Sequence, residues 1–229
     1  NVLSVFAKTD PTKGVEGISA FIVEKGTPGL SIGKREKKMG NKALNSCEVI
    51  FEDCRVPREN LMRGEGQGWL IAMETLDKTR PMVAAVGVGL AQGALDYAVQ
   101  YSKERVQFGK PTASFQAIQF KLADMAIEIE AARQLTYAAA AYIDEATSQP
   151  GWQKNKPLRA RMTMLGSMCK CYATDVAMRT AIEAAQVLGG YGYMQDYPME
   201  RHIRDAKLLQ IVEGTNEIQR TVISKLLLG

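Results

Sequence analysis

A carboxylate followed by glycine near the carboxyl terminus is the part of this sequence best suited to chemistry. Glu213 and Gly214 precede Thr215 and Asn216, which open an apolar helical stretch. Glycine lets the backbone and a ligand approach closely, and Thr215 or Asn216 can cap a helix whose amino end attracts anions. Such a carboxylate is more often a solvated or capping acid than a catalyst. Further motifs must therefore decide the role of Glu213.

A second pair of charged residues, Asp77 and Arg80, lies in the segment 76–81 at the start of a predicted helix. Residues three apart are neighbours on a helix, so by themselves they predict a surface ion pair. Such a pair contributes only about 0.2–0.5 kcal/mol. Without further information the surface pair is the favoured interpretation.

Two more segments carry polar and glycine residues in unusual patterns. Residues 101–110 contain Arg105, whose planar fork can donate two parallel hydrogen bonds to phosphate oxygens. The nearby Phe108 and Phe115 would fit a core equally well. In residues 186–193, Gly189 and Gly190 permit a turn that other residues make only at a cost. No strand precedes these glycines, so they match neither a Rossmann nor a P-loop fingerprint.

In this order the motifs resemble the acyl-CoA dehydrogenase family over essentially the whole chain, and residues 21–29, 38–40 and 51–57 match as well. The resemblance implies FAD-dependent oxidation of a fatty acyl-CoA to its trans-2-enoyl-CoA. Glu213 would remove the α-proton, and electrons would pass to an electron-transfer flavoprotein. Val212 and Asn216 replace the tyrosine and serine that are common in the family, but neither change removes the base.

The resemblance also implies roles for the other site residues. Asp77, Arg80 and Gly214 would contact the acyl-CoA. Flavin sites shared between subunits imply a homotetramer built as a dimer of dimers, in the bacterial cytoplasm or the mitochondrial matrix. The residues that would contact FAD are Arg105, Gln107, Phe108, Gln116, Gln186, Gly189, Gly190, Thr215 and Glu217.

The elements that position these residues follow from apolar periodicity. Short β-type runs at residues 2–7, 18–23, 30–32 and 49–51 give way, after a glycine-rich segment at 63–68, to helical spacing. We expect an α+β fold, with a partial antiparallel β-domain in residues 1–60 and an up-and-down four-helix bundle in residues 61–229. The chain begins inside a strand pattern, which suggests an upstream region. The expected helices cover residues 69–104, with Pro81 starting a new segment or a kink, then 114–146, a third ending at 187, 198–206 and 216–227.

Composition narrows the function classes. The net charge of +4 arises from interspersed charges, which gives little support to nucleic-acid binding. Cys169 and Cys171 point to opposite sides of a helix, and His202 is the one histidine, so we expect no metal site. No apolar run approaches the roughly 20 residues of a membrane span.

Two alternatives stay open at this point. One is a related enzyme, either an acyl-CoA oxidase or a dehydrogenase of alicyclic or aromatic acyl-CoA. The other is a non-catalytic helical assembly fragment, which would bind no flavin. The length and branching of the acyl chain are not set by these residues.

Overall fold

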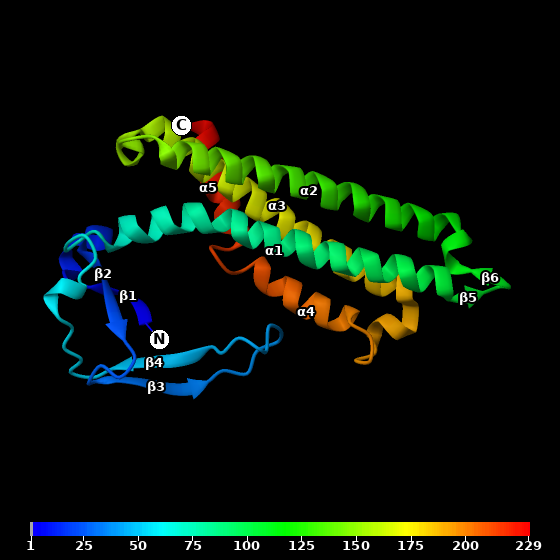
Figure 1. Ribbon diagram of the computed structural model, residues 1–229, viewed down its shortest axis with the longest axis horizontal. Coiled ribbons are helices and arrows are strands. Elements are labelled where there is room, and N and C mark those ends of the chain that lie inside the picture. The colour runs from blue at the N-terminus through cyan, green and yellow to red at the C-terminus, as the bar shows by residue number, and fades with distance from the viewer. Residues whose placement is uncertain (1) are drawn as a thin grey trace. The chain divides into compact units, whose positions relative to one another are not determined.

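The computed structural model describes residues 2–229 and has an α+β architecture (Figure 1), which confirms the predicted fold class. The polypeptide divides into two compact units. One consists of Asn1–Lys38 and Lys42–Leu76, and the other of Met39–Asn41 and Asp77–Gly229. The first unit holds paired strands and the second holds packed helices.

The described part of the first unit contains two antiparallel strand pairs. Val5 lies opposite Phe21 in the first pair, and runs of β-branched and aromatic residues favour this extended backbone. Ala20 and Val23 are buried, whereas several other apolar strand residues are exposed. The elements are β1 (Val2–Lys8), the 3-10 helix η1 (Pro11–Gly17), β2 (Ile18–Glu24), β3 (Leu30–Arg35), β4 (Cys47–Phe51) and the 3-10 helix η2 (Arg58–Asn60).

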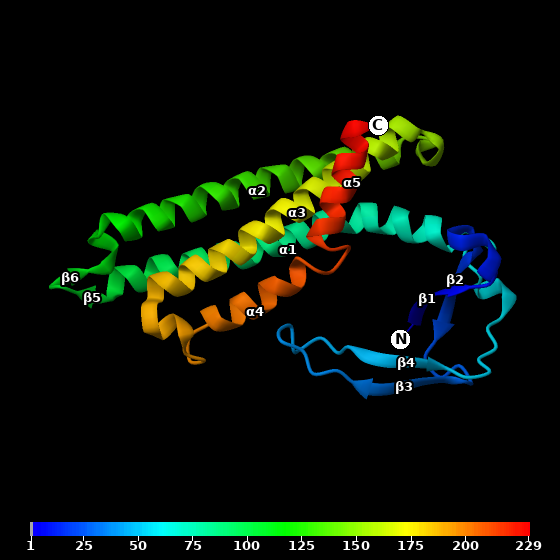
Figure 2. The ribbon, with the colours of Figure 1, turned by 180° about the vertical axis from the view of Figure 1, so that it is seen from behind.

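The second unit contains α1 from Asp77 onward, two further long helices and two shorter ones. The α3 helix contacts α2, α4 and α5, and α5 runs across α3 in both views (Figures 1 and 2). Asn155 caps α3 by accepting a hydrogen bond from the backbone N–H of Leu158. The elements are α1 (Gly68–Glu104), β5 (Val106–Gln107), β6 (Lys110–Pro111), η3 (Thr112–Ser114), α2 (Gln116–Ser148), η4 (Trp152–Lys154), α3 (Lys156–Leu188), η5 (Gly189–Tyr193), α4 (Met199–Leu209) and α5 (Asn216–Leu228).

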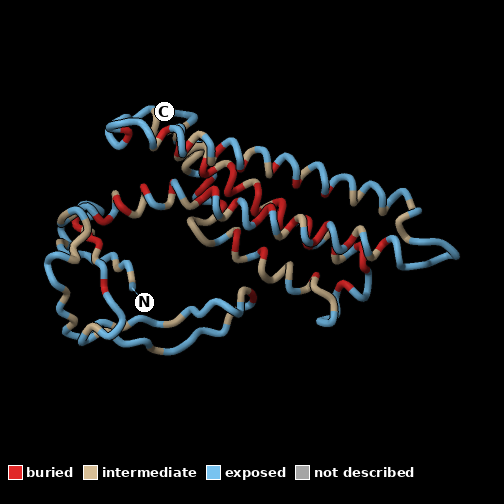
Figure 3. Tube along the Cα trace, viewed as in Figure 1, coloured by how far each residue is buried: buried red, intermediate tan, exposed pale blue. Residues whose placement is uncertain are grey.

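Small side chains allow the helices to approach closely. The buried positions follow the facing sides of the helices (Figure 3), and many of them are alanine. Gly87 on α1 favours this approach, because a Cβ there would make a tight contact of 3.0 Å with the carbonyl oxygen of Ala173 on α3. Larger buried side chains such as Met125, Ile129 and Val176 each stabilise the fold by about 1.5–3 kcal/mol. The result is a tight core that fixes the helix positions.

The α1 helix departs from the sequence expectations in two ways. It is continuous from Gly68 to Glu104, so Pro81 does not start a new helical segment. It also meets the length and composition of a membrane-crossing helix, with a mean hydropathy of 1.4, although the sequence led us to expect no such segment. The core helices of soluble proteins pass the same test, and 39% of the apolar window is buried in this structure.

Candidate functional site

The predicted base lies on a tight turn between α4 and α5. Glu213 has φ 58° and Gly214 has φ 87°, both in the left-handed region. A non-glycine residue in that region costs of order 1–3 kcal/mol and persists only where its surroundings hold it. Gly214 cannot be replaced without displacement, because a Cβ there would lie 2.5 Å from Nε2 of Gln219. The turn leaves Glu213 outside both helices and half-buried.

A threonine from α1 orients the Glu213 carboxylate. Thr79 Oγ1 donates a hydrogen bond to Glu213 Oε2 over 2.6 Å. Bonds of this length to an ionised carboxylate are about twice as strong as those between neutral groups. Thr79 lies between the two predicted substrate contacts, Asp77 and Arg80, yet sequence reasoning assigned it no role. Its position between two singled-out charges was the signal available.

Asp77 and Arg80 form the expected i,i+3 ion pair, but it is buried and does not lie on the helix surface. Arg80 Nη1 lies 2.8 Å from Asp77 Oδ1. Thr163 of α3 donates to Asp77 Oδ2 over 2.7 Å, and Arg80 also reaches Ser167 at 3.4 Å. Arg80 Nε is buried and has no hydrogen-bond partner within the described chain. The interpretation as a solvent-exposed surface pair is therefore wrong, because α3 covers both side chains.

Buried polar side chains lie beneath the Glu213 turn. Lys170 on α3 donates to the carbonyl oxygen of Gly214 over 2.9 Å and to Oδ1 of Asn216 over 2.7 Å. Burial lowers the pKa of Lys170 to about 8. Gln219 on α5 donates to the carbonyl oxygens of Glu213 and Gly214 over 3.2 and 3.0 Å. Sequence reasoning missed both residues, although a lone lysine within an apolar helix stretch was a usable signal.

Asn216 connects the buried side chains beneath the Glu213 turn to the carboxylate of Asp175. Its Nδ2 donates to Asp175 Oδ1 over 2.8 Å, and Arg220 reaches the other oxygen of Asp175 at 2.6 Å. Although burial opposes the effect, hydrogen bonds from Arg220, Gln210 and Asn216 lower the pKa of Asp175. Asn216, placed where the family often has serine, is thus fully paired and buried.

A second group of predicted residues gathers at the other end of α4. Arg105 and Gln107 line a cavity of about 620 Å³ together with Gly189 and Gly190. The Arg105 guanidinium lies 5.3 Å from the centre of the Tyr191 ring. None of the ion pairs found within residues 2–229 involves Arg105. A guanidinium beside a glycine wall, with no carboxylate partner in that part of the chain, fits a phosphate group.

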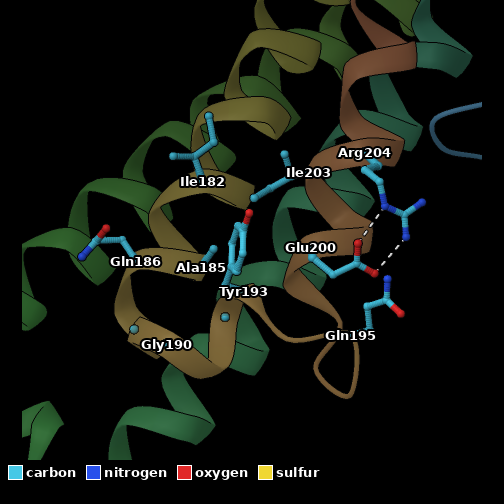
Figure 4. A pocket seen from close by; sticks show the side chains of 11 residues that line it. Ile182, Ala185, Gln186, Gly190, Tyr193, Gln195, Glu200, Ile203 and Arg204 are labelled. Atoms are coloured by element: carbon cyan, nitrogen blue, oxygen red, sulfur yellow. Dashed lines mark hydrogen bonds and ion pairs between the residues drawn. The ribbon is translucent and has the colours of Figure 1, made fainter.

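An adjoining cavity of about 810 Å³ is lined by Gln186 and the same two glycines (Figure 4). Side chains of α3 and α4 also line this cavity. On α4, the guanidinium of Arg204 makes a bidentate pair with the carboxylate of Glu200, with N–O distances of 2.7 and 2.8 Å. Gln186 and Gly190 line the same hollow from α3 and η5 (Figure 4). The glycine turn therefore separates two open spaces, both at one end of the bundle.

The hairpin β5–β6 carries the aromatic residue predicted to touch FAD. Phe108 and Gly109 have φ 52° and 79°, the backbone of a two-residue turn of the primed type. Phe108 is 91% exposed and meets Phe115 edge to face, with ring centres 6.0 Å apart. Gln116, at the start of α2, is also exposed. Phe108 is therefore not a core aromatic within the described chain.

Seven of the nine predicted flavin contacts form two groups. Thr215 and Glu217 lie at the start of α5 with Glu213, where Thr215 accepts a hydrogen bond from the N–H of Ile218. Arg105, Gln107, Gln186, Gly189 and Gly190 line the two cavities at the opposite end of α4, whereas Phe108 and Gln116 line neither of them. At 1.5 Å per residue, α4 holds the two groups about 16 Å apart along its axis. Within residues 2–229 no group of His, Cys, Asp and Glu has the arrangement of a metal site.

Comparison with protein families matches both parts of the chain. The model described as acyl-CoA dehydrogenase, C-terminal domain, matches residues 66–228. The model described as acyl-CoA dehydrogenase, middle domain, matches residues 1–54. Together these matches confirm the resemblance that the sequence motifs suggested.

Relatives and solved structures agree with these matches. A curated relative from Megasphaera elsdenii is named acyl-CoA dehydrogenase, short-chain specific. It is 50% identical to this chain, and the match covers 100% of this chain and 56% of the relative. The solved structure of butyryl-CoA dehydrogenase from the same organism has a TM-score of 0.91 at 50% identity, covering 100% of this chain and 56% of that one.

A chain in a solved structure described as the electron transferring flavoprotein of Acidaminococcus fermentans also has a TM-score of 0.91. It is 52% identical, and the match covers 100% of this chain and 57% of that one. The chain therefore spans little more than half the length of the proteins it matches.

Proposed function

Because this chain belongs to the acyl-CoA dehydrogenase family, we propose that the protein carrying it oxidises an acyl-CoA between Cα and Cβ, with Glu213 as the base. The product would be the trans-2-enoyl-CoA. The observation that carries the proposal is the position of Glu213 on a strained turn, with its carboxylate bonded to Thr79. Strained backbone of this kind gathers at functional sites, where the surrounding structure maintains it.

The turn supplies what removal of an α-proton needs. The carboxylate accepts the proton, while the thioester oxygen needs donors as negative charge develops on it. The backbone N–H of Glu213 makes no hydrogen bond with another residue of the described chain, so it is available to that oxygen. Gly214 has no side chain that would block the thioester.

FAD fits the residues at the other end of α4. When bound, FAD accepts the β-hydrogen as hydride. Arg105 would hold the pyrophosphate of an FAD bound mainly by a neighbouring subunit, with Gln107, Phe108 and Gln116 beside it. Gln186, Gly189 and Gly190 would lie along the adenosine of that same FAD. Thr215 and Glu217 would hold the flavin end near the base. Support for this arrangement comes from the guanidinium of Arg105, which makes no ion pair within residues 2–229, and from the two cavities that flank the glycine turn.

We also propose that Asp77, Arg80 and Gly214 form the acyl-CoA contact. Arg80 supports this assignment because its buried Nε has no partner in the described part of the chain. One matched protein is named as short-chain specific and another as a butyryl-CoA dehydrogenase. Butyryl-CoA is therefore the first substrate to assay, followed by longer-chain and alicyclic acyl-CoA thioesters.

The proposed partner is an electron-transfer flavoprotein, supported by the match to a chain in the Acidaminococcus fermentans structure. A homotetramer would bring the FAD contacts of neighbouring subunits together. The matched proteins named above come from bacteria, which favours the bacterial cytoplasm over the mitochondrial matrix.

The test compares the protein that carries this chain with its Glu213→Gln variant. Substrate oxidation is followed anaerobically with an electron-transfer flavoprotein, and oxygen consumption is measured separately. We expect the variant to keep its fold and flavin and to lose nearly all turnover. Wild-type turnover in the variant would disprove the role of Glu213. Oxygen-driven turnover would indicate an oxidase, and absence of visible flavin absorbance would favour the assembly fragment.

A further inference from the structure

The strained turn at Glu213 requires groups that hold it. Two successive residues with positive φ direct the carbonyl oxygens of Glu213 and Gly214 toward α3 and α5, where they accept hydrogen bonds. The donors are Lys170 on α3 and Gln219 on α5, and both side chains are fully buried, at 0% exposure. We call Lys170 and Gln219 the turn clamp.

The charge of Lys170 is unusual for its surroundings. None of the ion pairs found in residues 2–229 includes Lys170, and its Nζ hydrogen bonds go to a backbone carbonyl and an amide oxygen. A buried charge without a paired carboxylate is costly. The negative charges that raise its pKa against burial include Asp175 and Glu213, while Arg80 lowers it. Core packing alone does not explain why a buried ammonium group lies directly beneath the turn.

Gln219 completes the clamp from the other side. Its Nε2 contacts both carbonyl oxygens of the turn, at 3.2 and 3.0 Å, while its Oε1 is buried with no hydrogen-bond partner in the described chain. Leaving that oxygen unpaired has a cost, which indicates that the orientation of the amide is set by the turn. The clamp residues come from two helices in contact with each other (Figure 2), so the support is rigid.

We propose that Lys170 and Gln219 are positioning residues that set the carboxylate of Glu213 for removal of the α-proton. This inference rests on the proposed function. Thr79 contacts the carboxylate itself, whereas the clamp acts on the backbone from which the carboxylate projects. Reacting groups must be held within a fraction of an ångström, and a displacement of about 1 Å can lower a rate about 100-fold.

The experiment measures the rate at which Glu213 removes the α-proton, separately from hydride transfer. Acetyl-CoA has α-hydrogens but no β-carbon, so incorporation of deuterium from deuterium oxide reports proton removal alone. The exchange rate at saturating acetyl-CoA, the half-saturating concentration, FAD content and melting temperature are measured for Lys170→Met and Gln219→Met in the protein that carries this chain. Lys121→Met is the matched control, because Lys121 pairs with Glu183 on the outer side of α2 and α3.

We expect both clamp variants to bind FAD and acetyl-CoA as wild type does and to lose about 100-fold in exchange rate, while Lys121→Met exchanges normally. A folded, FAD-bound Lys170→Met protein with wild-type exchange would overturn the proposal. If Lys170→Met does not fold, wild-type exchange in a folded, FAD-bound Gln219→Met protein would overturn the proposal instead. If neither folds, the clamp serves the fold and not the base, and the proposal is wrong.

The same assay separates this inference from its premise. Glu213→Gln is measured alongside, and it should abolish exchange. Normal exchange in Glu213→Gln would overturn the assignment of the base itself. Loss of exchange in Glu213→Gln, together with normal exchange in both clamp variants, would overturn only the role of the clamp.

Discussion

The hydroxyl of Thr79 lies 2.6 Å from the carboxylate of Glu213, although 134 residues separate them in the chain. One residue comes from α1 and the other from the turn before α5. The bond joins α1 to the turn that carries the proposed base. It therefore depends on the packing of α1 against α3 and of α3 against α5.

Replacing Thr79 by valine keeps the shape of the side chain and removes the donor. A hydrogen bond to a charged group contributes about 1.5–3 kcal/mol, so we expect kcat/KM for butyryl-CoA to fall about 10- to 100-fold. Thr79→Ser keeps the hydroxyl and is the matched control, expected near wild type. Wild-type kcat/KM in Thr79→Val would show that the bond contributes nothing to turnover.

Replacing Gly214 by alanine should destabilise the turn. The new Cβ would meet Gln219 Nε2 at 2.5 Å, and φ 87° is unfavourable for alanine. We expect a loss of about 1–3 kcal/mol in the free energy of unfolding, measured by denaturant titration, together with loss of turnover. Gly64→Ala is the control, because a Cβ at Gly64 would meet no atom within 4 Å and the φ of Gly64 is not positive. Equal free energies of unfolding in the two variants would contradict the tight packing of Gly214 against Gln219.

The buried pair of Asp77 and Arg80 should respond differently from an exposed one. Arg80→Met leaves Asp77 buried without its cation, and breaking a buried pair in this way costs about 3–5 kcal/mol. The pair Arg133–Glu130, in which Glu130 is exposed, has the same i,i+3 spacing, and Glu130→Gln should cost only about 0.2–0.5 kcal/mol. Denaturant unfolding measures both changes. A small loss in Arg80→Met would mean that the pair is solvated.

Arg105 should be needed for FAD retention. Its fork can donate two parallel hydrogen bonds to phosphate, which lysine cannot reproduce. We expect Arg105→Lys to weaken FAD binding about tenfold or more, measured as the dissociation constant by flavin fluorescence. Lys103→Gln, two residues away and exposed at the end of α1, is the charge control. Unchanged FAD affinity in Arg105→Lys would remove Arg105 from the cofactor site.

Lys170 should give stability a particular pH dependence. Its pKa is about 8 in the fold, below the ordinary value of 10.5, because burial disfavours the charged form. Between these values the unfolded chain binds more protons, so the contribution of this group to the free energy of unfolding rises with pH. We expect the stability of wild type relative to Lys170→Met to increase across that range. A flat difference would mean that the pKa of Lys170 is not lowered.

Local patterns in the sequence were enough to predict the elements and several site residues. The three- and four-residue spacing of Phe115, Ile118, Leu122 and Met125 predicts α2, because those positions share one helix face. Thr215 and Asn216 were the two expected helix caps, and Thr215 caps α5. Glu213 was singled out by its neighbours along the chain. The family motifs also predicted the grouping of Arg105 with Gly189 and Gly190, which line one cavity.

Other features depended on tertiary structure. Burial of the Asp77–Arg80 pair, the bond from Thr79 to Glu213 and the contact of Lys170 with the turn all join residues on different helices. The sequence alone determined α1 to α5, β1 to β4 and the place of the carboxylate along the chain, because backbone hydrogen bonds and apolar periodicity act over a few residues. The short hairpin β5–β6 was not predicted. Packing decided which side chains hold that carboxylate, because contacts between helices depend on how close their small residues let them approach.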